Sequence, residues 1–155
     1  MTDEAQHTDP SVGAARELVI LLYASDRTVR ENVRFTLGRK VAADLAPIQV
    51  QEVATQPAVL AAMDRGGIDL VILDGEAVPG GMGLCRQLKD EIFPCPPVLV
   101  LTARRDDAWL ATWSRADGVV PHPVDPLRLP AVVATLLRTP DRTSTSTDVV
   151  PVGPA

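Results

Sequence analysis

Apolar and polar positions divide the chain into five short apolar segments, each followed by a segment with helical periodicity. Continuous apolar runs predict strands that are covered on both faces. The second segment instead alternates apolar and polar residues, which predicts a half-exposed edge strand. Pro121 directly follows the fifth segment, which suits a strand end or a sheet edge. The predicted strands are 18–23, 48–53, 68–73, 98–101 and 118–120.

The intervening segments predict amphipathic helices. In the first of them Val29, Val33, Leu37 and Val41 recur every four residues, behind the suitable N-cap Asp26. The predicted helices begin near Asp26, Pro57, Gly83, Asp106 and Pro126. Five strands alternating with five helices predict an α/β fold with a doubly wound parallel sheet. The edge character of the second and fifth strands fits the strand order 2-1-3-4-5.

The composition is that of one compact domain, with 155 residues, 46% of them hydrophobic and 23% charged. Residues 1–16 are polar and predict a flexible N-terminal segment. Residues 139–155 are rich in Thr, Ser, Asp and Pro, which predicts a disordered tail. The folded domain is therefore expected over residues 17–138.

Charge and hydropathy argue against several classes of protein. The start of the chain lacks the basic and apolar regions of a signal peptide, and no apolar run reaches the ~20 residues of a membrane span. We therefore expect a cytoplasmic protein that does not contact membranes. A formal net charge of -5 argues against nucleic-acid binding, which requires clustered Lys and Arg. Cys85 and Cys95 have neither zinc nor redox spacing and are expected to be buried.

The carboxyl ends of the predicted strands carry the candidate chemistry. In a sheet of this kind, ligands bind beyond the carboxyl ends of the strands, where the strand order reverses. An acid, a hydroxyl and a potential cation converge there from different strands. The residues at these ends are Ala24, Ser25 and Asp26, then Asp74 and Glu76, then Thr102 and Ala103, and finally His122 and Pro123.

Four landmarks of the sequence are similar to those of a known family. They are the strand 70–74 that ends in Asp74, the loop 78–84 with its Pro and Gly residues, the Thr-Ala pair at 102–103, and the segment 116–123. In this order they resemble the receiver domain of bacterial two-component response regulators, which has a flavodoxin-like fold. The resemblance covers about residues 17 to 138. It implies that Asp74 accepts a phosphoryl group from the phosphohistidine of a sensor kinase, with a divalent metal, and that the last helix and strand then shift to change partner binding.

Departures from the family pattern fall on the phosphorylation site. The two adjacent acids that hold Mg²⁺ in a receiver correspond here to Ala24 and Ser25, and Asp26 lies one position late. Because Mg²⁺ is usually held through one or two carboxylates, Asp74 and Asp26 are left as candidate ligands, with Glu76 as an alternative, and Mg²⁺ binding is expected to be weak or absent. His122 replaces the family's phosphate-binding Lys, and a neutral imidazole is expected there at cytoplasmic pH.

Each candidate also has a structural interpretation. Asp74 could simply cap the following turn, and Thr102 could be an ordinary strand residue hydrogen-bonded to a neighbour. His122 could be a partly exposed loop residue, although the resemblance suggests a cis bond between it and Pro123.

Trp109 and Trp113 lie four residues apart, on one face of a predicted helix. We expect one of them to pack in the core and the other to be exposed as an anchor for a partner. The resemblance makes the face from about 106 to 138 the candidate interface, for a homodimer or another signalling protein.

These observations predict an atypical, stand-alone response regulator with Asp74 as the candidate phosphoryl acceptor. It would not be an enzyme and would act through protein contacts, with a sensor histidine kinase as one partner. One alternative is a pseudo-receiver whose contacts do not depend on phosphorylation. Another is a flavodoxin-like nucleotide-binding enzyme, which rests on fold analogy alone because no phosphate-binding glycine loop is present.

Overall fold

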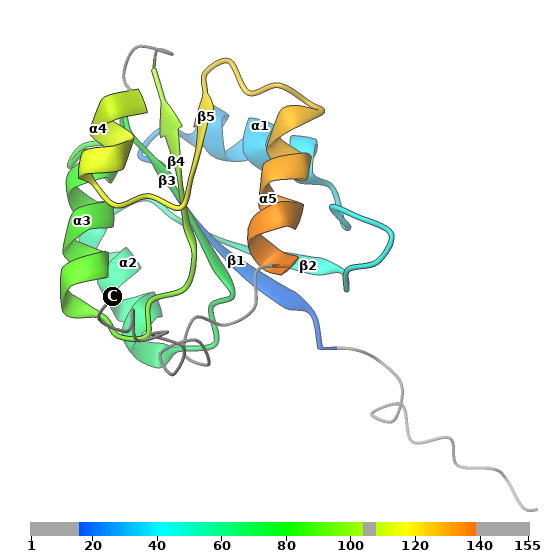
Figure 1. Cartoon of the computed structure of the whole chain (residues 1–155), viewed down its shortest axis with the longest axis horizontal. Helices are drawn as coiled ribbons and strands as arrows, with labels where there is room; N and C mark the ends of the chain where they lie inside the picture. Colours follow the sequence, from blue (N-terminus) through cyan, green and yellow to red (C-terminus); the bar gives the residue numbers. More distant parts are fainter. Residues whose placement is uncertain (1–15, 104–107, 139–155) are drawn as a thin grey trace, which may run out of the picture.

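Strands and helices alternate along the chain in the computed structural model, which describes residues 16–103 and 108–138 (Figure 1). The strands are β1 (Leu18–Tyr23), β2 (Ile48–Val53), β3 (Leu70–Asp74), β4 (Val98–Thr102) and β5 (Gly118–Pro121). The helices are α1 (Arg27–Leu37), α2 (Gln56–Arg65), α3 (Gly81–Glu91), α4 (Ala108–Trp113) and α5 (Arg128–Arg138). The predicted flexible segment, apart from Arg16, and the predicted tail 139–155 lie outside the described residues, as does the predicted helix start at Asp106.

The five strands form one parallel sheet in the order β2-β1-β3-β4-β5, which confirms the predicted topology. The register aligns their carboxyl ends: Tyr23 lies opposite Leu73, and Thr102 opposite Pro121. Residues that end or directly follow adjacent strands therefore meet along one edge of the sheet.

Helices cover both faces of the sheet, with α1 and α5 on one side and α2, α3 and α4 on the other (Figure 1). Every side chain of β3 and β4 is buried, which is why these strands read as unbroken apolar runs. Each fully buried Leu or Ile contributes about 1.5–3 kcal/mol of apolar burial. The two helical layers thus hold the central strands, and the residues at their ends, in fixed positions.

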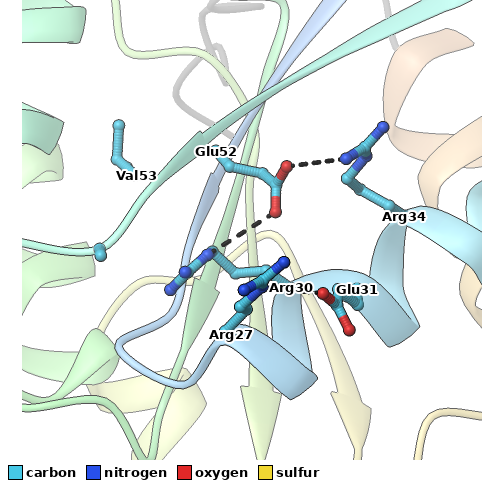
Figure 2. A pocket seen from close by; sticks show the side chains of 7 residues that line it. Arg27, Arg30, Glu31, Arg34, Glu52 and Val53 are labelled. Atoms are coloured by element: carbon cyan, nitrogen blue, oxygen red, sulfur yellow. Dashed lines mark hydrogen bonds and ion pairs between the residues drawn. The ribbon is translucent and has the colours of Figure 1, made fainter.

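β2 is a half-exposed edge strand, as its alternating sequence predicts. Ile48 and Val50 pack into the core layer under α1 and α5. Glu52 lies on the same face, two residues further on, and points towards the arginines of α1 (Figure 2).

The N-cap predicted for the first helix is confirmed, but other helix boundaries differ from those predicted. The Asp26 side chain accepts a hydrogen bond from the Thr28 amide at 2.8 Å. α1 ends at Leu37 because Gly38 adopts a positive φ of 62°. Val41 therefore lies beyond the helix, contrary to prediction, although it still packs against the same core.

Two later helices also begin at residues other than those predicted. α3 begins at Gly81, before the predicted end of the loop at Gly83. A Cβ atom at Gly81 would collide with the backbone of Asp74, so the helix can begin this close to the strand end only with glycine. α5 is assigned from Arg128 instead of Pro126, but the Asp125 carboxylate accepts hydrogen bonds from the two amides at 127 and 128, as an N-cap directly before Pro126 would.

A buried ion pair lies at the amino-terminal end of the strands, opposite the edge described above. The Lys89 ammonium of α3 donates to Asp117 Oδ2 at 2.5 Å, and the two side chains are only 11% and 7% exposed. The same oxygen accepts from the Val98 amide at 2.8 Å. Asp117 therefore connects α3 to the starts of β4 and β5.

Cys85 is fully buried in the core, as predicted, whereas Cys95 is only partly buried, contrary to prediction. Burial raises the pKa of the Cys85 thiol to about 11 and also raises the pKa of Cys95. Both thiols are therefore protonated at neutral pH and are poor nucleophiles. Within the described ranges, none of the helices has the length and apolar character that crossing a bilayer requires.

Candidate functional site

The ends of three adjacent strands bring Asp74, Thr102 and His122 together. Asp74 ends β3 and is only 2% exposed, and Thr102 ends β4. His122 follows β5, and its amide donates to the Thr102 carbonyl at 2.7 Å. His122 Nε2 lies 3.2 Å from Asp74 Oδ1. The predicted acid, hydroxyl and basic group thus form one cluster.

The Asp74 carboxylate has two partners in this cluster. Besides contacting His122, its Oδ1 accepts a hydrogen bond from the Glu76 amide at 3.0 Å. This second contact is the turn cap that the structural interpretation predicts. Capping and site chemistry are compatible, because both contacts use Oδ1 and neither involves Oδ2.

Thr102 Oγ1 is buried and has no hydrogen-bond partner among the described residues. The structural interpretation holds for the backbone, since the Thr102 carbonyl accepts from the His122 amide, but it leaves the hydroxyl unexplained. A buried hydroxyl without a partner costs about 1–3 kcal/mol. An oxygen-rich group bound beside Asp74 would supply the missing partner.

His122 is half-buried, and its bond to Pro123 is cis, as the resemblance suggests. The hydrogen bond with Asp74 raises the pKa of His122 above its ordinary value, although burial opposes the shift. The negative charges of Asp74 and Glu76 act in the same direction as the hydrogen bond. The raised pKa shifts the equilibrium at this position towards the imidazolium, whereas the sequence led us to expect a neutral imidazole.

We expect the Asp74→Asn substitution to lower the pKa of His122 towards the ordinary value of about 6.5. The contact with Asp74 should stabilise the fold fully below that value and lose its effect as the pH rises through the folded-state pKa. A histidine NMR titration of both variants measures the first effect, and urea unfolding between about pH 5 and 8, where histidine titrates, measures the second. Identical His122 pKa values in the two variants would contradict this assignment.

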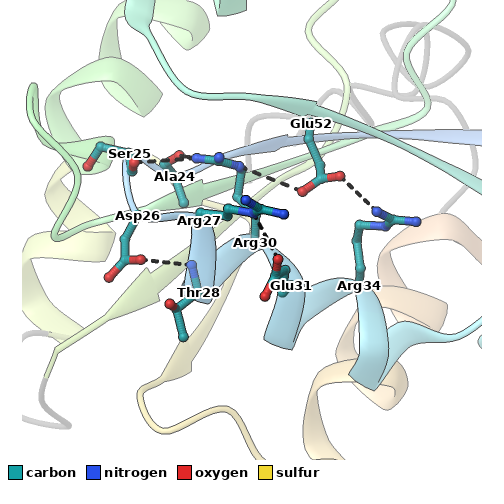
Figure 3. Close-up of polar contacts among 9 residues, drawn as sticks. All are labelled: Ala24, Ser25, Asp26, Arg27, Thr28, Arg30, Glu31, Arg34 and Glu52. Atoms are coloured by element: carbon teal, nitrogen blue, oxygen red, sulfur yellow. Dashed lines mark hydrogen bonds and ion pairs between the residues drawn. The ribbon is translucent and has the colours of Figure 1, made fainter.

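The carboxyl end of β1 does not offer the ligands that Mg²⁺ requires. Ala24 is buried and has no side-chain donor, and Ser25 and Asp26 are exposed. Asp26 is engaged as the cap of α1, and Arg30 Nη1 donates to the Ala24 carbonyl at 2.6 Å (Figure 3). In the part of the chain that the structure describes, no three His, Cys, Asp or Glu residues gather as a metal site. The residues present do not fit a receiver's magnesium.

Tyr23 belongs to the site but was not predicted from the sequence. Its hydroxyl donates to the Pro79 carbonyl at 2.8 Å, which ties the loop after β3 to the end of β1. Burial raises the pKa of Tyr23, and the charge of Asp74 adds to this effect. One feature of the sequence could have indicated this role. Tyr23 is the single tyrosine of the chain, and it directly precedes Ala24 and Ser25, where the family has its two acids.

Trp109 and Trp113 are both exposed, at 66% and 50%, so the expectation that one of them packs in the core is wrong. Trp113 instead packs against a neighbouring helix at the surface, where the Arg86 guanidinium of α3 lies 4.7 Å from its ring centre. The short helix α4 thus presents both rings to solvent. Ala103, the remaining predicted site residue, is partly buried next to Thr102.

Comparisons with known proteins agree with this fold. Two Mycobacterium tuberculosis proteins, named uncharacterized response regulatory proteins MT3230 (strain CDC 1551 / Oshkosh) and Rv3143 (strain ATCC 25618 / H37Rv), are each 57% identical over 124 residues. These alignments cover 79% of this chain and 93% of each relative. No family model matches the chain.

Solved structures are similar in fold. The response regulator DrrB of Thermotoga maritima aligns with a TM-score of 0.66 and 23% identity, over 79% of this chain and 53% of DrrB. The chemotaxis response regulator CheY4 of Vibrio cholerae aligns with a TM-score of 0.65 and 20% identity, over 78% of this chain and 99% of CheY4.

Proposed function

Because the chain belongs to the response regulators of two-component signalling and is their receiver domain, we propose that Asp74 is its phosphoryl acceptor. Receivers are in general signalling modules and not enzymes. In the proposed step, the P–N bond of a phosphohistidine on a partner kinase breaks as a P–O bond to Asp74 forms. The electron pair of the broken bond stays on the partner's histidine nitrogen.

The Thr102 hydroxyl, which has no hydrogen-bond partner among the described residues, carries this proposal. It is buried on the strand adjacent to Asp74, where a phosphoryl oxygen would accept its hydrogen bond. His122 lies beside Asp74 Oδ1, and when protonated, which its raised pKa favours, it supplies a positive charge in place of the family's Lys. Together they give an acyl phosphate one hydroxyl donor and one charged donor.

We propose that this transfer proceeds without a resident Mg²⁺, since Ala24 and Ser25 replace the acids that would hold it. Preorganised charge at a site of this kind is typically worth about 10²–10³ in rate for each donor. The transfer should therefore be slow compared with that of a receiver that has the full acidic pocket. Neither Asp26, which caps α1, nor the exposed Glu76 compensates for the loss.

Mass spectrometry after incubation with acetyl phosphate or phosphoramidate, with and without Mg²⁺, tests the proposal. An adduct of ~80 Da at Asp74 in both conditions supports it. An adduct that requires Mg²⁺ would instead mean that Asp26 or Glu76 completes a metal site.

The absence of any adduct, also with a phosphorylated sensor kinase, would favour the alternative of a phosphorylation-independent pseudo-receiver. The observation that favours this alternative is the same substitution of the acidic pair by Ala24 and Ser25.

We further propose that this regulator acts in the cytoplasm through protein contacts, and that the 106–138 face carries them, in a homodimer or with another signalling protein. Trp109 is the better anchor of the two, because Trp113 is partly engaged by Arg86. An exposed Trp at the centre of an interface is typically worth at least ~2 kcal/mol of binding free energy.

We expect Trp109→Ala to weaken self-association by at least about 30-fold, and Trp113→Ala to weaken it less. Sedimentation equilibrium measures the change. Phe35→Ala is the matched control, since Phe35 is an exposed aromatic residue on α1, outside this face. If both Trp variants keep the size and partner binding of the wild type, this interface is refuted.

A further inference from the structure

A second polar site lies between α1 and the edge strand β2, apart from the Asp74 cluster. It is a cavity of about 310 Å³, and neither Asp74, Thr102 nor His122 lines it. Three arginines of α1 and two glutamates supply the charged groups of its lining (Figure 2). We propose that this cavity binds a small anion that carries a diphosphate group.

Helical spacing places the three arginines on the side of α1 that faces β2. Arg27, Arg30 and Arg34 are separated by three and four residues, so their side chains emerge from successive turns of one face. Glu31 and Glu52 offset two of the three positive charges. The cavity therefore keeps one surplus positive charge, in a chain whose formal net charge is -5.

Arg30 is held in place before any ligand arrives. Its side chain is only 17% exposed, and Nη1 donates to the Ala24 carbonyl at 2.6 Å. Its Nε lies 3.6 Å from Glu52 Oε1 (Figures 2 and 3). Because this guanidinium is already ordered, the Arg30 side chain loses little further conformational entropy when a ligand binds it.

Arg27 and Arg34 keep donors available for a ligand. A guanidinium carries five N–H donors, and among the described residues the ion pairs of Arg27 and Arg34 use one nitrogen of each. Arg27 Nε contacts Glu31 Oε1 at 2.9 Å, and Arg34 Nη1 contacts Glu52 Oε2 at 3.0 Å. The remaining N–H groups have the fork geometry that pairs with phosphate oxygens.

The distances favour two linked phosphates over one. The backbones of Arg27 and Arg34 are about 10 Å apart along the helix, at 1.5 Å per residue, with Arg30 between them. A single phosphate can engage two neighbouring guanidinium groups, whereas a diphosphate is long enough to engage groups along the whole row from Arg27 to Arg34. The volume lies at the lower limit of ligand pockets, about 300–1,000 Å³, so a compact ligand is required.

Substitutions of Glu52 and of the arginines should change the affinity for an anion in opposite directions. Its carboxylate lies between Arg30 and Arg34 and repels an anion, so Glu52→Gln should raise the affinity for inorganic pyrophosphate by about 10-fold. Arg34→Gln and Arg27→Gln should each lower the affinity by about 10-fold. Arg65→Gln makes the same change in charge at the far end of α2 and should have no effect.

Isothermal titration of the full chain with pyrophosphate, and separately with ADP, in metal-free buffer measures these affinities. Tighter binding of ADP would assign the site to a nucleotide, and equal binding would assign it to the diphosphate alone. The proposal fails if neither compound binds at millimolar concentration, or if Arg27→Gln and Arg34→Gln bind as tightly as wild type. Asp74→Asn should bind normally, so this result is independent of the phosphorylation of Asp74.

Discussion

We expect the Asp74→Asn variant to form no ~80 Da adduct with acetyl phosphate, under conditions in which the wild type is modified. The carboxylate is the nucleophile, and an asparagine amide of the same shape cannot form the acyl phosphate. The oxygen of the substituted amide could still accept the hydrogen bond from the Glu76 backbone, so the turn after β3 should persist. Intact-mass spectrometry reports the loss, and circular dichroism shows whether the variant is folded.

Thr102→Val distinguishes a role of the Thr102 hydroxyl in phosphoryl transfer from a merely structural role. It removes the buried hydroxyl, for which the described part of the chain offers no partner, and keeps the β-branched shape of the side chain. The rate of adduct formation should fall by about 10²–10³, because one donor to the phosphoryl oxygens is lost. Stability should stay the same or rise, since an unsatisfied buried polar group is replaced by a methyl group.

Two results would count against the assignment of Asp74. One is an adduct of equal yield in Asp74→Asn, which would move the acceptor to another residue, such as the exposed Glu76. The other is an unchanged rate in Thr102→Val, which would leave the unpartnered hydroxyl without a role in phosphorylation.

The architecture could be predicted from the sequence because burial in a parallel sheet leaves a local signature. The central strands β3 and β4 are buried at every position, and their sequences are continuous apolar runs. The edge strand β2 alternates because only one of its faces is covered. The helix boundaries were less predictable: the start of α3 depends on the approach of Gly81 to Asp74, a contact made only in the folded chain.

The candidate site could be predicted as a set of residues but not as a set of interactions. Strand ends and family landmarks identified Asp74, Thr102 and His122, which the structure brings together. The burial of the Thr102 hydroxyl without a partner in residues 16–103 and 108–138 and the raised pKa of His122 depend on packing and distance, which no local pattern encodes. The hydroxyl contact of Tyr23 spans 56 residues and was missed for the same reason.

The exposure of both tryptophans shows a limit of periodicity. Spacing by four residues places Trp109 and Trp113 on one helical face, but it does not say which face. Large aromatic residues are usually buried, so a core position was expected for one of them. The structure instead presents both at the surface.

We expect Asp117→Asn to destabilise the domain by ~3–5 kcal/mol, because it leaves the buried Lys89 ammonium without its counter-charge. The oxygen of the substituted amide could still accept the hydrogen bond from the Val98 backbone, so the loss would report mainly the charge. Urea unfolding followed by far-UV circular dichroism measures the change.

Asp90→Asn is the matched control for Asp117→Asn, since Asp90 pairs with Arg115 at 2.7 Å on the surface, where both side chains are about half exposed. Exposed pairs are worth at most about 1 kcal/mol, so the two substitutions of Asp by Asn should differ severalfold. Adding Lys89→Met to Asp117→Asn should recover part of the loss, because it removes the unpaired charge. Equal effects of Asp117→Asn and Asp90→Asn would mean that water reaches the Lys89 ammonium and that the pair does not hold α3 to the sheet.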